Sequence, residues 1–367
     1  MQVWIPDGQV ILLDVFTPVL SVLAIEGALY FDPNRPVSLD AYYVFVNGGL
    51  MQVGTAEKPY TGHATITLHG DRYNTIEIPN IGAKCLAVAN KDMPEPDDGP
   101  GKHVPARYVG QLEIHGKKRL RTWTFLAETA VAGSNFFVTL EKVDFAPGEM
   151  LILTGSELPR GDSDIGSFGA EELVVQSNLD GYRIYVTAPL QFTHRSEVVR
   201  AQGKTINLRC EVGLLSRNVV IQGSKTESIG QLFGVHTVAM MSGIFRIENA
   251  EVRYCGQAYR FGRYCTHSHR ALNMEGSYVK ANSIHNSFQR AVTTHDTNYW
   301  EVRDNVAYNV MGHAYFLEDG TGKFMLRNIY SCQLRCESTL LIFSSSFNVF
   351  CGLFFHPHVL MQRHTTR

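Results

Sequence analysis

Short runs of alternating apolar and polar residues, separated by glycine, proline or asparagine, extend along most of the chain. Ile25–Leu29 and Val46–Leu50 are two such runs, 21 residues apart, and each flanks its glycine with alternating apolar residues. An alternation with a period of two is the pattern of a half-buried β-strand. Helical periodicity is scarce, so the pattern predicts an all-β fold.

The clearest repeat lies in the second half of the chain, where Asn282, Asn305 and Asn328 follow one another at intervals of 23 residues. Regular periods of this size are typical of solenoids, and the length suits three short strands with three turns. The repeat therefore predicts a right-handed parallel β-helix with coils of about 21–23 residues. In stacked coils the three asparagines would form a structural ladder of hydrogen bonds. The alternative is that each asparagine occupies a left-handed turn position.

The same pattern divides the chain into four parts. Residues 1–125 are predicted to form an N-terminal β domain with an exposed insertion at about 89–110, which is rich in proline, glycine and charged residues. Residues 126–210 are a connecting β region, for which more β-helix and a small barrel-like insertion both stay open. Residues 211–330 are predicted to form the β-helix repeats. Residues 331–367 do not resemble further coils and are interpreted as an atypical tail, truncated or disordered.

Composition and charge narrow the classes of function without choosing one. Apolar residues make up 44% and charged residues 19% of the chain, as in ordinary folded proteins. The formal net charge of −2 gives no reason to expect a nucleic-acid partner. The seven cysteines are scattered and can form one or two disulfides in an oxidising compartment, with at least one thiol left over. No signal peptide is visible at the N-terminus.

Several motifs, taken in order, resemble a known family. The N-terminal part resembles the G8 domain, named for its glycines, and the later part resembles the parallel β-helix (PbH1) coils of the same proteins. The family includes fibrocystin, fibrocystin-L, the cell-surface hyaluronidase and the hyaluronan-binding cell migration-inducing protein. The residues that carry the resemblance are Ile25-Glu26-Gly27, Val46-Asn47-Gly48-Gly49, Ala64–Gly70, Leu112–Gly116, Gly262-Arg263-Tyr264, Ser283-Ile284-His285, Arg290–Thr293 and Gly312–Gly320.

The resemblance implies an extracellular location, because family members are secreted or have large ectodomains on a single membrane anchor. It implies a glycan (hyaluronan-like) or protein ligand, no nucleic acid, and a membrane contact only through parts of a larger chain. The hyaluronan-degrading relatives carry an additional domain between the G8 domain and the β-helix. The segment from Trp123 to Leu153 leaves no room for it, which favours the fibrocystin-L branch.

Candidate chemistry follows from the 23-residue offset, which predicts what stacks upon what. Three pairs are expected: His295 over Glu318, Asp296 over Asp319, and Arg290 over His313. Polysaccharide-active β-helices use an acid to protonate a glycosidic oxygen and a base to activate water. The candidate catalytic residues are therefore His267, His269, His295, Glu318 and Asp319. The candidate substrate-binding residues are Arg263, Arg290 and His313.

The same cluster has two other interpretations. Histidine and carboxylate side chains are metal ligands, so the cluster could hold a divalent ion, with calcium as the candidate cofactor. Alternatively, the imidazoles are structural stack residues and Glu318-Asp319-Gly320 is an ordinary turn. Where relatives commonly read Arg-Tyr-Pro-Ile-His-Phe-His, this chain reads Arg263-Tyr264-Cys265-Thr266-His267-Ser268-His269. The loss of apolar neighbours around the histidines makes an intact catalytic site less favoured.

Three functions stay open. The first is a non-catalytic extracellular segment of a fibrocystin-L-like receptor that binds a glycan or a protein, and we prefer it. The second is a hydrolase that cleaves hyaluronan or another polysaccharide at the histidine and acid cluster. The third is a structural spacer. The basic run Lys117–Arg121 would suit contact with an acidic glycan, or else is a solvated strand end.

Overall fold

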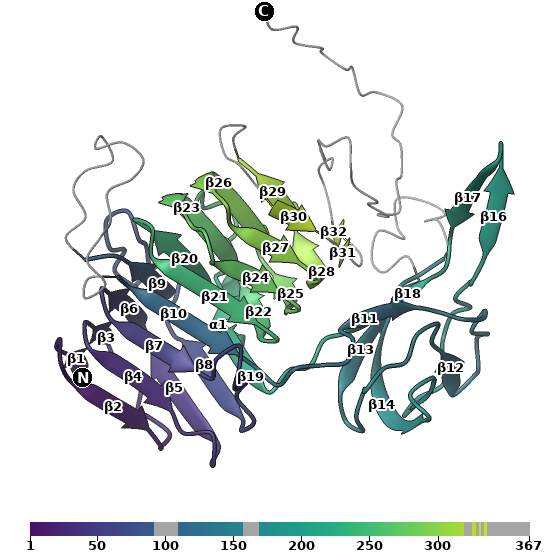
Figure 1. Cartoon of the computed structure of the whole chain (residues 1–367), viewed down its shortest axis with the longest axis horizontal. Coiled ribbons are helices and arrows are strands. Elements are labelled where there is room, and N and C mark those ends of the chain that lie inside the picture. The colour runs from purple at the N-terminus through teal and green to yellow at the C-terminus, as the bar shows by residue number, and fades with distance from the viewer. Residues whose placement is uncertain (92–108, 157–168, 319–324, 328–329, 332–333, 336–367) are drawn as a thin grey trace, which may run out of the picture.

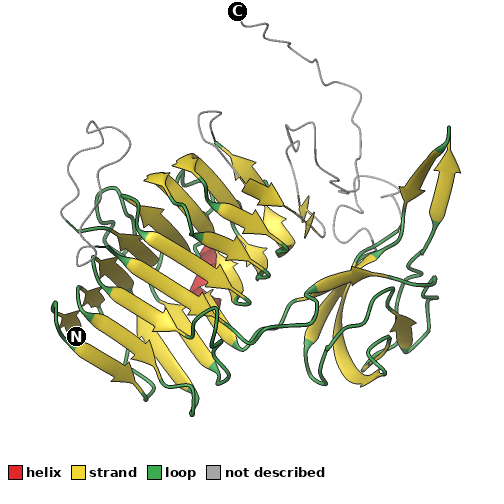
Figure 2. Ribbon diagram, viewed as in Figure 1, coloured by secondary structure: helices red, strands yellow, loops and turns green. Residues whose placement is uncertain are grey.

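The computed structural model describes residues 1–91, 109–156, 169–318, 325–327, 330–331 and 334–335. The predicted fold class is confirmed: these residues form an almost entirely β structure built around a parallel β-helix, with a short helix α1 (Lys225–Gln231) (Figures 1 and 2). None of the helices in the described ranges is long and apolar enough to cross a membrane. Asp319, Asn328, most of the predicted insertion and most of the tail lie outside these ranges.

Three parallel sheets form the walls of the β-helix, and successive strands along the chain visit the sheets in turn. In spatial order the first sheet contains β1 (Gln2–Ile5), β3 (Val22–Ile25), β6 (Tyr43–Asn47), β9 (Cys85–Ala89), β20 (His236–Met240), β23 (Thr266–Asn273), β26 (Val292–Asn298) and β29 (Tyr315–Leu317). The second contains β2 (Val10–Leu13), β4 (Ala28–Phe31), β7 (Leu50–Val53), β10 (Gln111–His115), β21 (Ile244–Glu248), β24 (Tyr278–Lys280), β27 (Glu301–Arg303) and β30 (Met325–Arg327). The third contains β5 (Val37–Ala41), β8 (Ala64–Leu68), β19 (Val219–Gly223), β22 (Glu251–Cys255), β25 (Ser283–Ser287), β28 (Val306–Met311) and β31 (Tyr330–Ser331), and β32 (Leu334–Arg335) also pairs with β28.

The N-terminal coils and the later coils belong to one continuous solenoid. Strand β9 pairs in parallel with β20, and β10 pairs in parallel with β21, although more than a hundred residues separate the partners in the chain. Inward side chains from both parts line a single hydrophobic core. Because each fully buried Val, Leu or Ile contributes about 1.5–3 kcal/mol, this shared core is the main source of stability for the solenoid.

A separate antiparallel unit, residues 123–214, interrupts the solenoid between β10 and β19 and lies beside it (Figure 1). Its sheet runs β11 (Trp123–Phe125), β18 (Glu211–Leu214), β13 (Met150–Leu153), β14 (Glu171–Leu179), β15 (Arg183–Val186) and β12 (Phe136–Val138), and a hairpin joins β16 (Val198–Ala201) to β17 (Lys204–Asn207). This inserted unit has a hydrophobic core of its own. It occupies the junction where the sequence analysis expected no room for the additional domain of the hyaluronan-degrading relatives.

The two ends of the inserted unit meet on the solenoid. The backbone N–H of Lys117 donates to Asn218 Oδ1 at 2.8 Å, and Asn218 Nδ2 donates to the carbonyl oxygens of Tyr60 and Gly62 at 2.9 and 2.7 Å. Strand β19 then takes the place in the third sheet that completes the coil begun by β9 and β10. The coil is therefore closed independently of the unit inserted into it.

The predicted 23-residue offset holds for most neighbouring coils but is wrong for β23 and β26. Ser283 pairs with Val306, 23 residues later, whereas His269 pairs with His295, 26 residues later. The register shifts between His269 and Leu272, where the backbone takes positive φ angles at Arg270 and Leu272. A bulge of this kind adds residues to one strand without changing its partner, so a fixed period cannot locate it.

Candidate functional site

Three histidines from neighbouring coils lie together on the outer side of the first sheet. Strand alternation directs Thr266 and Ser268 inward, and it places His267 and His269 on the opposite side. His269 pairs in register with His295 on the next coil. The ring centroids of His267 and His269 are 5.0 Å apart, as are those of His269 and His295. We call these three residues the histidine cluster.

His267 is the buried member of the cluster, with only 1% of its surface exposed. Its Nδ1 lies 3.2 Å from the carbonyl oxygen of Gly262, which can only accept a hydrogen bond, so Nδ1 carries the proton. Its Nε2 is buried and has no hydrogen-bond partner in the described structure. Burial, helped by the neighbouring His269, lowers the pKa of His267 well below its usual value, so the ring is neutral at physiological pH.

Glu318 approaches the cluster from β29 and is held by a cation and a phenol. Its carboxylate lies 3.5 Å from Arg290 Nη1, 3.3 Å from the Tyr264 hydroxyl and 3.9 Å from His295 Nδ1. Arg290 also donates to the Tyr264 hydroxyl at 2.9 Å, and its guanidinium stacks 3.6 Å over the ring of Phe316. The structure therefore brings four of the candidate catalytic residues and Arg290 into one neighbourhood.

The other candidate residues lie elsewhere or outside the described ranges. Arg263 packs its guanidinium against Gly82, where any side chain would collide with it. The His313 ring contacts Phe316, with 4.9 Å between ring centroids. Asn305 Oδ1 accepts hydrogen bonds from the backbone N–H and the side-chain amide of Asn282, at 3.0 and 3.1 Å. Asn328, the third rung of the proposed ladder, lies outside the described residues, as does Asp319.

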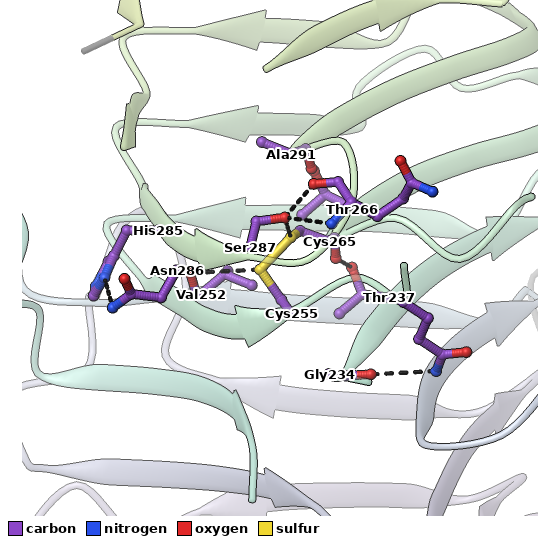
Figure 3. Close-up of a disulfide and its surroundings, with 12 residues drawn as sticks. Gly234, Thr237, Val252, Cys255, Cys265, Thr266, His285, Asn286, Ser287 and Ala291 are labelled. Atoms are coloured by element: carbon purple, nitrogen blue, oxygen red, sulfur yellow. Dashed lines mark hydrogen bonds between the residues drawn. A yellow bond between two sulfur atoms is a disulfide. The ribbon is translucent and has the colours of Figure 1, made fainter. Parts of the chain in front are cut away.

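A disulfide supports the loop that covers His267. Figure 3 shows the bond between Cys255, at the end of β22, and Cys265, just before β23. The loop it closes carries Gly262, whose carbonyl oxygen faces His267, and Tyr264, whose ring meets the His267 ring edge-on at 4.8 Å. The sequence alone could not select this pair from the seven cysteines. Among the described residues, Cys85 and Cys210 are buried free thiols.

A second candidate site is a groove that sequence reasoning found only in part. About 510 Å³ in volume, it lies between residues 118–123, which lead into the inserted unit, and the turns that follow strands of the second sheet. Its basic and aromatic lining residues are Lys118, Arg119, Arg121, Trp123, Lys280 and Arg303. The basic run at 117–121 was visible in the sequence. Its proximity to Lys280 and Arg303 depends on the stacking of distant coils.

Ion pairs organise the floor of this groove. Lys280 lies 3.3 Å from Glu248, which in turn lies 3.4 Å from His115. Burial opposes a charge on His115, but hydrogen bonds from Glu113 and Glu248 outweigh it and raise the pKa of the imidazole. On the rim, Lys117 and Lys118 are exposed, and neither has an ion-pair partner among the residues that the structure describes. The groove therefore has a neutralised floor and a positively charged rim.

Comparison with known proteins places this architecture among related chains. The G8 domain model matches residues 1–127, and the CEMIP beta-helix model matches residues 232–346. Human (Homo sapiens) fibrocystin-L is 33% identical over 361 residues, which cover 86% of this chain and 8% of fibrocystin-L. A G8 domain-containing protein of Dictyostelium discoideum is 29% identical over 297 residues, covering 80% of this chain and 17% of that protein. This chain thus spans less than a tenth of the length of fibrocystin-L.

Among solved structures, the tailspike gp61 of Pseudomonas phage phi297 aligns with this chain at 13% sequence identity. The alignment covers 82% of this chain and 41% of the tailspike, with a TM-score of 0.24.

Proposed function

We propose that this chain, which belongs to the family that joins a G8 domain to a CEMIP-type β-helix and is homologous to fibrocystin-L, is an extracellular segment that binds an acidic glycan without cleaving it. The observation that carries the proposal is the groove beside the inserted unit, with its exposed basic rim. An extracellular location agrees with the Cys255–Cys265 disulfide, because disulfides persist in oxidising compartments.

The rim offers the groups that anionic sugars require. Lys117, Lys118 and Arg121 are exposed on one chain segment, and Arg303 lies across the groove from it. Arginine and lysine form charge-assisted hydrogen bonds with carboxylates and sulfates, and these are stronger than neutral ones. Trp123 adds an aromatic surface to the lining of the same groove. An acidic polysaccharide of the hyaluronan type fits this combination better than a neutral one.

The histidine cluster supports binding rather than cleavage. Glycoside hydrolysis needs a carboxylic acid that donates a proton and a second carboxylate at a defined distance from it. Glu318 is paired with Arg290, and a nearby cation favours the ionised carboxylate, which has no proton to donate. His267 is covered by the loop that ends at Cys265, so it cannot contact a polymer. The competing hydrolase function would have to use Glu318 and the two outer histidines.

The test measures retention and chain length together. We would immobilise the full chain and pass size-defined hyaluronan, chondroitin sulfate and neutral dextran over it at several salt concentrations. Retention of the acidic glycans, weakening with salt and without shortening, is the expected result. The double variant Lys118→Ala/Arg121→Ala should lower the affinity about tenfold, because it removes two charge-assisted contacts. A matched control is Arg35→Ala/Arg195→Ala, which removes two exposed, ion-paired arginines far from the groove.

Each alternative function predicts a different result. Shortening of hyaluronan that is lost in Glu318→Gln would establish the hydrolase and overturn the proposal. Equal weakening in the control variant would mean that the groove is not the binding site. No retention of any glycan by a folded chain would leave a protein ligand or a structural spacer.

A further inference from the structure

We propose that the histidine cluster binds one divalent transition-metal ion of the zinc class. His267, His269 and His295 each offer one ring nitrogen, and these three atoms all lie within 4.8 Å of one another. Three imidazoles with a remaining open position are a common zinc ligand set. This inference rests on the cluster alone and is independent of glycan binding in the groove.

The outer pair of histidines already has the spacing of two ligands on one ion. The Nδ1 atoms of His269 and His295 are 3.2 Å apart. In a tetrahedral site with Zn–N distances of about 2.0–2.1 Å, two ligand nitrogens lie about 3.3 Å from each other. A metal ion could therefore replace the contact between these rings with little movement of either strand. Strand pairing fixes the two residues in register, which holds the spacing.

His267 is prepared to be the third ligand. Because its Nδ1–H donates to the Gly262 carbonyl oxygen, its Nε2 carries the lone pair. That Nε2 is buried and has no hydrogen-bond partner in the described structure, an unfavourable state for a polar atom. Metal-ligating histidines usually donate their other N–H to a carbonyl or carboxylate, which fixes the tautomer and the ring orientation. Gly262 fills that supporting role here.

The surroundings suit a cation and select its type. Glu318 lies 3.9 Å from His295 Nδ1 and brings a negative charge to the open side of the cluster. Neutral imidazole nitrogens suit zinc, copper and nickel, whereas calcium requires six to eight oxygen ligands. The donor set therefore favours a zinc-class ion over the calcium considered from the sequence. The Cys255–Cys265 disulfide supports the loop from which Gly262 contacts His267.

The experiment uses the full chain after removal of metal with EDTA. Titration calorimetry with Zn²⁺, checked by elemental analysis of the dialysed protein, is expected to give one ion per chain. Co²⁺ should give the intense visible absorption bands of a tetrahedral site. Ca²⁺ should neither bind at this stoichiometry nor displace Co²⁺. The variant His267→Gln/His295→Gln should weaken Zn²⁺ binding by about 100-fold or more.

Two further variants keep the test decisive. His295→Gln alone changes a half-buried side chain, so it still reports on the cluster if substitution of the buried His267 disturbs folding. The control His63→Gln/His69→Gln removes two histidines from a distant coil and should leave zinc affinity unchanged. Circular dichroism establishes that each variant is folded. The proposal fails if the folded His295→Gln variant binds Zn²⁺ as tightly as the original chain, or if Co²⁺ shows only the weak bands of an octahedral aqua ion.

Discussion

The early and late coils of the solenoid are built on the same three sheets but fill them with different side chains. One inward column of the first sheet runs through Ile25, Val46 and Val88 in the early coils and continues through Ser268 and Thr294 in the late coils. All five side chains are buried. An apolar column thus becomes a hydroxyl column without any change in strand pairing.

The same change affects the opposite face of this sheet and leaves polar atoms unsatisfied. Phe45 and Val238 stand in the column that later contains His267 and Thr293. Ser268 Oγ, Thr293 Oγ1 and His267 Nε2 are buried without a hydrogen-bond partner in the described structure. Each such group costs about 1–3 kcal/mol. The comparison teaches that the early coils supply stability, whereas the late coils sacrifice some of it to hold groups with chemical potential.

The largest expected effect is the loss of an early core residue. Ile25→Ala should lower the free energy of unfolding by about 3–4 kcal/mol, because Ile25 is fully buried in the shared core and alanine would leave a cavity. Denaturant unfolding followed by circular dichroism measures the change. A loss below about 1 kcal/mol would mean that the early coils are not the stable region.

The disulfide is expected to have the next largest effect. Cys255→Ala/Cys265→Ala should cost about 2–3 kcal/mol, since the bond closes a loop between residues ten apart in sequence. The same variant should weaken Zn²⁺ binding, because Gly262 would no longer be held against His267. Reduction of the original chain by dithiothreitol is the matched comparison. Unchanged stability in both experiments would show that strand pairing alone holds the loop.

Acid should destabilise the fold through His236, which lies on β20 where early and late coils meet. Complete burial lowers the pKa of His236 to about 3. Below about pH 6.5 the unfolded chain takes up a proton that the folded chain cannot, so stability falls with pH down to the folded-state pKa. This residue alone should remove about 2 kcal/mol between pH 7 and pH 5. Denaturant midpoints at both pH values, measured in EDTA, check the loss.

A matched pair of variants assigns that acid sensitivity. His236→Leu places an apolar side chain beside Cys85, its partner in the sheet, and should flatten the pH dependence. His63→Leu changes an exposed histidine and should leave the pH dependence unchanged. Equal pH dependence in the original chain and in His236→Leu would move the cause to other histidines of the late coils.

The smallest effect is expected at the polar end of the compared column. Ser268→Ala removes a buried hydroxyl that has no hydrogen-bond partner in the described structure. The free energy of unfolding should change by less than about 0.5 kcal/mol, in either direction. This variant occupies the same column as Ile25→Ala, so the two measurements compare directly. A loss above about 1 kcal/mol at Ser268 would mean that its hydroxyl is satisfied in solution.

Local patterns predicted the fold, and contacts between distant coils decided the sites. The spacing of Asn282 and Asn305 gave the coil length, because stacked coils repeat the same turn. The bulge after His269 escaped prediction because it inserts residues without altering the alternation on either side. The groove joins residues 118–121 to Arg303, and their proximity depends on where the chain leaves the solenoid and re-enters it.

The meeting of Lys117 with Asn218 makes the inserted unit a removable part of the architecture. A segment whose ends are anchored side by side contributes nothing to the path of the coil, so its length and content are free to change. Related chains could exchange, enlarge or lose this unit while every strand of the solenoid keeps its partner. Joining residue 117 to residue 218 through a short turn would reduce the protein to an uninterrupted β-helix. New binding surfaces can thus be grafted at this point without redesigning the fold that supports them.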